Sequence, residues 1–315
     1  MMEIHEFDWK DIPDLPGCVY ACGYFDGLHK GHQQLFDQAK AMAARLHCQW
    51  GILTFHPDPW TVFKPEANVD HITSLQDRMD LARKLGCQQF CVLKFTKDFA
   101  GRQPEEFHDI LKAMHAKGLV TGFDFRYGSR NAGSVKTLKI CGLPVEVVQE
   151  VRDHDQKISS TRIEACLRKG DVAQAAFLLG RPYSIAGHVT HGYSRGSTLL
   201  GFPTANLEPL PGYIQPAAGV YAGYVEIQGI HHPAMINVGT NPTFGNTHAT
   251  MEAHLLDFEG DLYGRPVRFE FTDRIREEKK FASADALKAQ LEKDRETTRQ
   301  VLMAKRDKEL DAAYN

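Results

Sequence analysis

The first half of the chain alternates short apolar runs with longer segments in which apolar residues recur at helical spacing. Apolar runs typical of buried strands occur at 19–22, 50–55, 90–93 and 119–121. Apolar residues spaced as on one face of a helix occur at 33–46, 75–85 and 104–114. Strands separated by helices of this length predict an α/β fold with a parallel sheet, whose ligand site lies at the carboxyl ends of the strands.

Boundary residues define two of these helices more closely. Ser74 and Asp77 are spaced as a capping box, and Gly86 is the expected end of the helix that they open. Pro104 is expected at the first position of the next helix, and Gly118 is expected to end it.

The pattern changes near Arg181. Two helical segments, 159–168 and 172–179, end at Gly180, and short alternating segments separated by turn residues follow. These predicted strands are 183–190, 220–227, 233–238, 251–258 and 266–271. Short strands at this spacing predict a small closed β-barrel.

A charged amphipathic segment from Ser283, a plausible N-cap, to about Leu310 predicts a C-terminal helix with a solvated face. A chain of 315 residues, 43% of them apolar, is long enough for two cores. We therefore expect two domains, 1–180 with the parallel sheet and 181–315 with the barrel and the C-terminal helix.

Composition narrows the classes of function. A net charge of −3 argues against a general nucleic-acid or membrane-surface binder, since both normally present a basic face, and favours small-molecule chemistry. The seven cysteines lack C-x-x-C spacing, which speaks against a disulfide framework or a zinc ribbon. Cys18 with Cys22, and Cys87 with Cys91, fall in strand-like runs and are expected to be small core residues rather than metal ligands.

No apolar stretch has the length of a membrane span, and the acidic start M-M-E-I-H-E is unlike a signal peptide. We therefore expect a cytoplasmic protein that binds neither membranes nor nucleic acid. The sequence leaves its oligomeric state open.

The segment 23–32 reads G-Y-F-D-G-L-H-K-G-H and joins a predicted strand to a predicted helix. Its three glycines, which allow left-handed dihedrals and the close approach of a ligand, are Gly23, Gly27 and Gly31. Free N–H groups at the start of the helix favour a phosphate. His29 and His32 share a face if helical geometry has begun there, so both imidazoles could reach one polyphosphate. A single histidine on a helix is more often an ordinary surface or core residue, but the pairing of the two inside a turn with three glycines favours a phosphate site.

H-x-G-H in this setting resembles the adenylyl- and cytidylyltransferases, whose histidines stabilise charge on the transferred phosphate. F-D-G ahead of it is similar to the FAD synthetase branch of that group. The resemblance implies a Rossmann-like nucleotidyltransferase domain. It also implies an ATP site that includes Gly23, Phe25, Asp26, Gly27, His29 and His32.

Two further segments resemble FAD synthetase motifs. T-F-H-P-D-P at 54–59 resembles T-F-x-P-H/N-P, with Asp58 in place of His or Asn, which puts a carboxylate where a hydrogen-bond donor is usual. F-D-F-R-Y-G at 123–128 is similar to the strand G-x-D-F-R-F-G, which implies that Asp124 and Arg126 bind the flavin. Their alternative is an ion pair with each other. The basic turn that follows in the family is displaced here, at 129–133.

The segment 157–162 reads K-I-S-S-T-R and places two hydroxyls and two cations at the opening of a helix. Such a set forms an anion site, although an ordinary serine N-cap also fits. The segment resembles the S-S-T-x-I/V element of FAD synthetases, which implies that Lys157, Ser160 and Thr161 grip the triphosphate of ATP.

The barrel half carries P-T-A-N at 203–206, alone a weak turn motif. It lies among blocks at 191–196, 219–222, 236–244, 252–258 and 276–281 that, in this order, resemble riboflavin kinase. The resemblance implies an ATP and Mg²⁺ site formed by Gly192, Gly196, Gly201, Thr204 and Asn206, with Thr204 and Asn206 at the metal. The loop 197–200 is one residue longer and less basic than is usual in the family.

Resemblance also makes Glu252 the general base of the kinase, since a carboxylate accepts a proton at neutral pH without activation. Its alternative is a strand-face glutamate in a surface ion pair. Asp257 is the competing base, and because strand residues alternate faces, at most one of the two faces the substrate in a regular strand.

From about residue 15 to 295 the chain is similar to the bifunctional riboflavin kinase/FAD synthetases. The implied activity is phosphorylation of riboflavin to FMN by ATP with Mg²⁺, then adenylylation of FMN to FAD with release of pyrophosphate. Two alternatives are a kinase with a lost or altered adenylyltransferase, motivated by Asp58 and the displaced basic turn, and a non-enzymatic flavin-binding regulator.

Overall fold

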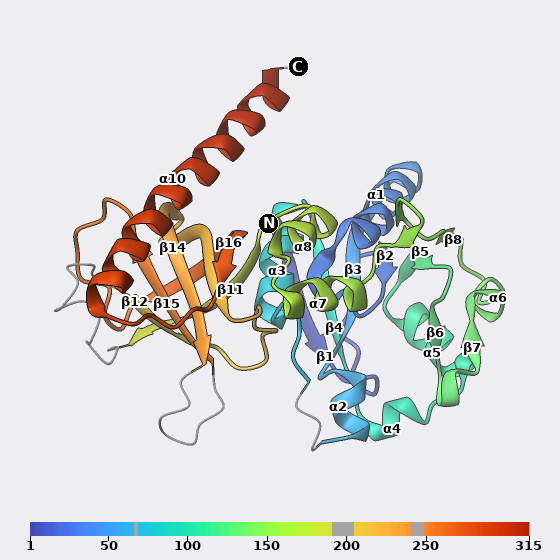
Figure 1. Ribbon diagram of the computed structural model, residues 1–315. Helices are drawn as coiled ribbons and strands as arrows, with labels where there is room; N and C mark the ends of the chain where they lie inside the picture. The colour runs from blue at the N-terminus through green and yellow to red at the C-terminus, as the bar shows by residue number, and fades with distance from the viewer. Residues whose placement is uncertain (66–68, 191–204, 241–248, 315) are drawn as a thin grey trace. The chain divides into compact units, whose positions relative to one another are not determined.

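The computed structural model describes residues 1–65, 69–190, 205–240 and 249–314 (Figure 1). The chain forms two compact units, Met1–Ser160 and Thr161–Asn315. The predicted boundary at Arg181 falls later, inside the second unit.

A six-stranded parallel sheet is the centre of the first unit. In spatial order the strands are β1 (Glu3–Phe7), β4 (Gln89–Lys94), β3 (Gln49–His56), β2 (Cys18–Cys22), β5 (Ala116–Gly122) and β8 (Val145–Val148). The chain moves from β2 to β3 on one side and later returns to pair β5 on the other side, so the strand order reverses at β2. The parallel α/β prediction is confirmed, and the reversal places the expected ligand crevice at the carboxyl end of β2.

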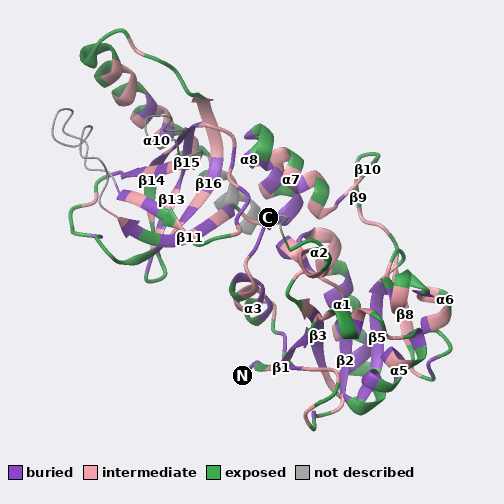
Figure 2. Cartoon of the chain, turned by 90° about the horizontal axis from the view of Figure 1, so that it is seen from below, coloured by how far each residue is buried: buried purple, intermediate pink, exposed green. Residues whose placement is uncertain are grey.

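Helices cover both faces of this sheet. Leu35, Phe36 and Ala39 of α1 (Lys30–Arg45) and Ala82 of α3 (Leu75–Lys84) pack on one face, and Phe107, Ile110 and Leu111 of α5 (Pro104–Ala113) pack on the other. Residues of β2 alternate between the two cores, and the strand is buried along its whole length (Figure 2). The capping box of Ser74 and Asp77 is present.

The predicted helix end at Gly118 is wrong. Helix α5 ends at Ala113, and the chain turns at His115, whose φ is 54°. Gly118 lies inside β5, where an added Cβ would come 2.4 Å from the sulfur of Met42. This glycine therefore provides room for α1 against the sheet instead of ending a helix.

The smaller elements of the first unit connect these layers. They are η1 (Asp26–Leu28), α2 (Pro59–Phe63), α4 (Lys97–Ala100), β6 (Arg126–Tyr127), η2 (Ser129–Asn131), β7 (Gly133–Ser134), α6 (Val135–Leu138), β9 (Arg152–Asp153) and β10 (Gln156–Lys157).

All seven cysteines are free thiols. Cys18, Cys22, Cys87 and Cys91 are buried, as expected of small core residues. Burial raises the pKa of the Cys87 and Cys91 thiols to about 12, so these groups stay protonated and apolar at neutral pH.

A closed antiparallel barrel is the centre of the second unit, as predicted. Around the barrel the strands are β11 (Tyr183–Thr190), β12 (Ala205–Pro209), β15 (Ala249–Leu255), β14 (Ile230–Thr240), β13 (Gly219–Ile227) and β16 (Pro266–Glu277). Strand β12, which contains the end of the P-T-A-N motif, was not predicted. Aromatic residues fill the interior, where the Phe271 ring stacks on Tyr183 and meets Tyr221 edge-on.

Among the described residues, the helices that accompany the barrel are α7 (Ser160–Lys169), α8 (Val172–Leu179) and α10 (Ala284–Tyr314). Helix α8 packs on β11 and β16 and ends at Gly180, whose φ is 76°. The Ser283 hydroxyl accepts a hydrogen bond from the N–H of Ala286, as expected of an N-cap. Helix α10 packs on β13, β14 and β16 and continues beyond them (Figure 1).

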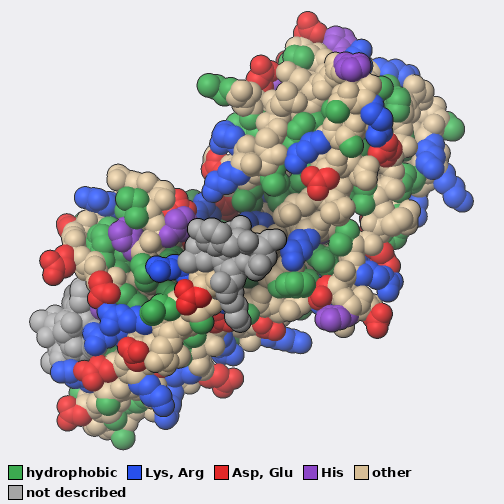
Figure 3. Space-filling model, turned by 90° about the horizontal axis from the view of Figure 1, so that it is seen from above, with side chains coloured by type: hydrophobic (Ala, Val, Ile, Leu, Met, Phe, Trp, Pro, Cys, Tyr) green, Lys and Arg blue, Asp and Glu red, His purple; other side chains and the backbone are tan. Residues whose placement is uncertain are grey.

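The surface mixes charges of both signs. On the face shown in Figure 3, basic and acidic side chains are interspersed. No helix among the described residues combines the length and the apolar character that a membrane span requires.

Candidate functional site

The glycine-rich turn lies at the carboxyl end of β2, where the strand order of the sheet reverses. Gly27 uses the left-handed conformation, with φ of 80°, but so do Phe25 at 58° and Leu28 at 41°. Two left-handed residues that carry side chains store backbone strain, which persists only where the surroundings hold it.

The other two glycines provide space. A Cβ at Gly23 would lie 2.9 Å from the Phe25 ring, and one at Gly31 would lie 3.0 Å from the His29 ring and 3.4 Å from the carbonyl oxygen of Ile158. Of the three glycines, Gly27 adopts the left-handed conformation that the sequence predicts. At Gly23 and Gly31 the groups that come close are side chains and backbone of the protein itself.

His29 and His32 lie together, but not as two positions of one helix face. His29 is the N-cap of α1 and has extended backbone, and its Nδ1 accepts a hydrogen bond of 3.3 Å from the N–H of His32. The two rings stack with centroids 3.6 Å apart, and the ring of Phe25 meets His32 edge-on. Since Nδ1 is an acceptor here, the proton of neutral His29 lies on Nε2, which makes that atom a hydrogen-bond donor.

Asp26 holds the turn to the segment that precedes α3. Its carboxylate accepts hydrogen bonds from the N–H groups of Ile72 and Thr73 at 3.0 and 2.9 Å, and from the Thr73 hydroxyl at 2.9 Å. The Thr73 hydroxyl in turn accepts from the N–H of Gly27 at 2.8 Å. These bonds give Asp26 a role in the shape of the turn.

The segment ahead of α7 approaches the same turn. The hydroxyl of Ser160 donates to the carbonyl oxygen of Asp26 at 3.0 Å. Lys157, three residues earlier, forms an ion pair of 2.5 Å with Asp124 and lies 4.9 Å from the ring centroid of Phe123. Thr161 follows Ser160 in α7 and is exposed. The structure therefore brings Ser160 to the histidine turn and links Lys157 to Asp124.

The alternative reading of Asp124 and Arg126 as a pair is wrong, because the partner of Asp124 is Lys157. Arg126 is exposed in β6, and within the described part of the chain it forms no ion pair. Arg130 of the displaced basic turn is also exposed, with φ of 52°. These two arginines are not joined to the turn by any described hydrogen bond.

Asp58 has a local structural task. Its carboxylate accepts from the N–H of Trp60 at 2.6 Å and caps α2. His71 lies between two carboxylates, 3.8 Å from Asp58 and 3.9 Å from Asp26. Asp58, the residue that departs from the family pattern, therefore has His71 beside it, and no sequence motif marks this histidine.

In the barrel, the register of the strands places Glu252 next to Asn206. Asn206 of β12 pairs with Glu252 of β15, and Glu252 pairs on its other side with Asn237 of β14. Directly paired residues point to the same face of a sheet, so the three side chains form a row across three strands. Burial raises the pKa of Glu252 above its ordinary value. In the sequence Asn237 is one residue of the block 236–244, and only the strand register shows that it pairs with Glu252.

The competing base, Asp257, lies elsewhere. Strand β15 ends at Leu255, and Asp257 is exposed with φ of 57° and an ion pair of 2.6 Å to Arg299 of α10. The remaining predicted kinase residues, Gly192, Gly196, Gly201 and Thr204, lie outside the described residues.

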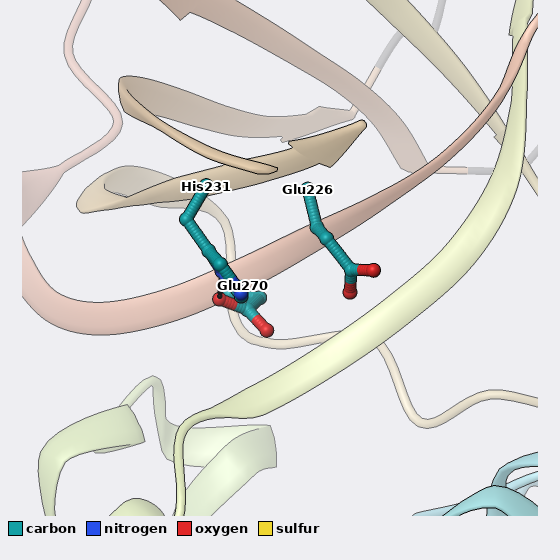
Figure 4. A group of neighbouring side chains, drawn as sticks. All are labelled: Glu226, His231 and Glu270. Atoms are coloured by element: carbon teal, nitrogen blue, oxygen red, sulfur yellow. Dashed lines mark hydrogen bonds and ion pairs between the residues drawn. The ribbon is translucent and has the colours of Figure 1, made fainter. Parts of the chain in front are cut away.

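A third group of ligand-type side chains lies on the barrel, formed by Glu226, His231 and Glu270 (Figure 4). His231 Nδ1 is 2.8 Å from Glu270, and Arg268 lies 3.8 Å from Glu226. Each carboxylate therefore has a protein partner of opposite or protonatable character, and the group is accounted for as an ion-pair network.

Comparison with known proteins covers both units. A FAD synthetase family model matches residues 11–162 and a riboflavin kinase family model matches residues 179–302. The bifunctional riboflavin kinase/FMN adenylyltransferase of Bacillus subtilis is 38% identical over 88% of this chain and 90% of its own length. That of Listeria monocytogenes is 37% identical over 93% of both chains. A solved Streptococcus pneumoniae structure, described as a macrolide-efflux protein, is 38% identical with a TM-score of 0.87, covering 93% of this chain and 98% of that one.

Proposed function

The chain belongs to the bifunctional riboflavin kinase/FMN adenylyltransferase family, and from this premise we propose how its residues divide the two reactions. The protein phosphorylates riboflavin to FMN and adenylylates FMN to FAD, with ATP as co-substrate of both steps. The observation that carries the division is the separation of the two groups of side chains into different compact units, with Thr161, the first residue of the second unit, as the one exception.

Adenylyl transfer takes place at the glycine-rich turn of the first unit. A phosphate oxygen of FMN attacks the α-phosphorus of ATP, a new P–O bond forms, and pyrophosphate leaves with the electrons of the broken P–O bond. His29, through Nε2–H, and His32 donate to the phosphate oxygens and stabilise the charge that develops on them. Lys157, Ser160 and Thr161 hold the triphosphate, and Gly23, Phe25, Asp26 and Gly27 shape the turn.

Asp124 and Arg126 remain our proposed flavin contacts in this unit. Because Lys157 pairs with Asp124, ATP binding at Lys157 and flavin binding at Asp124 share one ion pair. A phosphate that draws Lys157 away from Asp124 would free the carboxylate for the flavin.

Phosphorylation takes place on the barrel. Glu252 accepts the proton of the 5′-hydroxyl of riboflavin as its oxygen attacks the γ-phosphorus of ATP, and ADP leaves. Asn206 and Asn237, paired with Glu252 on either side, orient the reacting groups. Gly192, Gly196, Gly201 and Thr204 complete the nucleotide site in our assignment.

Mg²⁺ is the divalent cation that we assign to the kinase. The side-chain oxygens of Asn206 and Asn237 beside the Glu252 carboxylate are the hard donors that Mg²⁺ prefers, so the residues present fit the ion. When bound with Thr204 and Asn206, Mg²⁺ neutralises charge on the phosphates of ATP. A cytoplasmic location is proposed on the seven free cysteines and on the supply of ATP there.

One incubation tests the assignment against its alternatives. Purified protein is supplied with riboflavin, ATP and Mg²⁺, and the flavins are separated by chromatography. FAD is the expected product. FMN without FAD would indicate an impaired adenylyltransferase, and unchanged riboflavin would indicate a flavin-binding regulator.

A further inference from the structure

Arg78 of α3 is a buried cation that contacts the start of the glycine-rich turn. Its side chain is only 2% exposed, and its Nη1 donates a hydrogen bond of 2.7 Å to the carbonyl oxygen of Tyr24. The centre of the guanidinium also lies 4.6 Å from the centroid of the Tyr24 ring. One planar group therefore fixes both the backbone and the ring of the residue that leads into the turn.

In the part of the chain that the structure describes, this guanidinium has no matching carboxylate. Among the residues that the structure describes, no acidic side chain lies within ion-pair distance of Arg78, and its Nε is buried without a hydrogen-bond partner. A buried charge that is not paired is costly to retain. Such a violation of ordinary packing rules is expected at functional sites.

The position of Arg78 completes a clamp on the strained part of the turn. The segment 72–78 contacts the turn on both sides of Phe25, through Arg78 at Tyr24 and through Ile72 and Thr73 at Asp26. Phe25 has φ of 58° and requires this kind of support. The backbone that is held in this way leads directly to His29 and His32.

We propose that Arg78 is a positioning residue for adenylyl transfer, acting through the carbonyl and ring of Tyr24 on the backbone that carries His29 and His32. Its positive charge, which no described carboxylate neutralises, also adds to the attraction of the turn for anionic phosphates. The inference rests on the assignment of FMN adenylylation to the first unit, and it does not apply to the kinase.

The test compares three variants of the full chain. Arg78→Met removes the charge and both contacts, Arg78→Lys keeps the charge and one donor but not the planar contact, and Arg83→Met on the same helix removes an exposed arginine paired with Asp80 as a control. The kcat and KM for FMN and ATP are measured together with riboflavin kinase activity and thermal unfolding. The kinase activity serves as an internal reference for intact protein.

We expect Arg78→Met to lower the adenylyltransferase kcat by about 10- to 100-fold, the range expected when a reacting group is displaced by about 1 Å. The adenylyltransferase kcat of Arg78→Lys should lie between those of Arg78→Met and the wild type. Its KM for ATP should be closer to the wild-type value. The kinase activity of each Arg78 variant should stay within about twofold of wild type, since the kinase does not involve the contacts of Arg78. The adenylyltransferase constants of Arg83→Met should also stay within about twofold of wild type.

Two outcomes would overturn the proposal. One is a folded Arg78→Met protein whose adenylyltransferase constants equal those of the wild type. If that variant unfolds the first unit, Arg78→Lys decides, and a folded lysine variant with wild-type kcat would show that the planar contact is not needed. A wild-type protein that makes no FAD would instead contradict the assigned function itself.

Discussion

His29 combines two tasks in one imidazole ring, because Nδ1 caps α1 and the proton of the neutral ring lies on Nε2, which makes that atom a donor. Replacing His29 or His32 with Ala should depress FAD formation, by about 2–4 kcal/mol of transition-state stabilisation, while FMN formation stays nearly intact. His29→Asn separates the two tasks, since asparagine is a good N-cap but cannot reach as Nε2 does.

We therefore expect His29→Asn to lose as much adenylyltransferase activity as His29→Ala. The unfolding temperature of His29→Asn should be higher than that of His29→Ala, because the N-cap is kept. The measurements are FAD and FMN formation by the same preparation and thermal unfolding of each variant. Equal loss of both activities in either variant would indicate misfolding or a shared site instead.

Glu252 is in register with Asn206 and Asn237, whereas Asp257 is ion-paired with Arg299 beyond the end of β15. Glu252→Gln keeps the shape of the side chain and removes the base, so we expect a loss of about 10²–10⁴ in kinase kcat with flavin binding largely retained. Asp257→Asn is the matched control and should turn over normally. The opposite pattern in steady-state kinetics would assign the base to Asp257.

The same substitution should stabilise the barrel. Burial raises the pKa of Glu252 in the folded state, so this group favours folding while it is protonated, and that contribution is lost as pH rises through the raised pKa. Glu252→Gln stays neutral throughout. We expect its unfolding temperature to exceed that of the wild type at pH 7 to 8, with the difference shrinking towards about pH 4, where an ordinary glutamate takes up its proton.

Thermal unfolding followed across this range of pH measures the effect. A difference that grows as the pH falls would mean that the Glu252 carboxylate is stabilised as an ion in the fold. That result would contradict the cause given for its raised pKa.

At the scale of elements, the strand-to-helix connection from β2 to α1 depends on close packing as well as on backbone conformation. Gly31 has an ordinary φ, but a Cβ there would lie 3.0 Å from the His29 ring and 3.4 Å from the carbonyl oxygen of Ile158. Gly31→Ala should therefore displace His29 by a few tenths of an ångström without unfolding α1, since alanine is a good helix former.

We expect this variant to lose about 10-fold or more in adenylyltransferase kcat and to retain its helical circular dichroism and its kinase activity. Gly101→Ala is the control, because Gly101 also has an ordinary φ and its added Cβ would meet only the backbone carbonyls of Lys97 and Asp98. A Gly31→Ala variant as active as Gly101→Ala would show that the ring of His29 tolerates the shift.

The elements that the sequence predicted well are those with a strong local signal. Long amphipathic periods with capping residues predicted α3, and Gly180 predicted the end of α8. Strand β1 was missed because its residues mix charged and apolar side chains, as edge strands do. Strand β12 was missed because a turn motif read alone gives no sign that its last residues pair with β11 and β15.

The candidate sites show the same limit. Motifs identified the residues of the glycine-rich turn, but Arg78 carries no motif and is distinguished only by burial and by its contacts with Tyr24. Asn237 likewise joins Glu252 through strand register, which depends on long-range pairing. The pairing of Asp124 with Lys157 instead of Arg126 also follows from chain segments that meet only in the fold.

At the scale of the whole molecule, the two activities should separate with the two compact units. A fragment that begins at Arg181 contains every kinase motif, but it lacks α8, whose buried residues Val172, Ala175, Leu178 and Leu179 belong to the second unit. It also lacks Lys169, whose carbonyl oxygen accepts a hydrogen bond from Arg274 of β16. Each buried leucine contributes about 1.5–3 kcal/mol, so the loss of α8 is large against the stability of a small domain.

We therefore expect fragments 161–315 and 181–315 both to phosphorylate riboflavin, and the longer fragment to unfold at a clearly higher temperature. The fragment 1–160 is the control and should form no FMN from riboflavin, because Asn206 and Glu252 lie outside it. The measurements are FMN formation and thermal unfolding of each fragment. If fragment 161–315 is folded but inert, the kinase requires residues of the first unit and the modular interpretation fails. If the two fragments unfold at the same temperature, α8 contributes nothing to the barrel, and the boundary near Arg181 that the sequence pattern predicts is the better one.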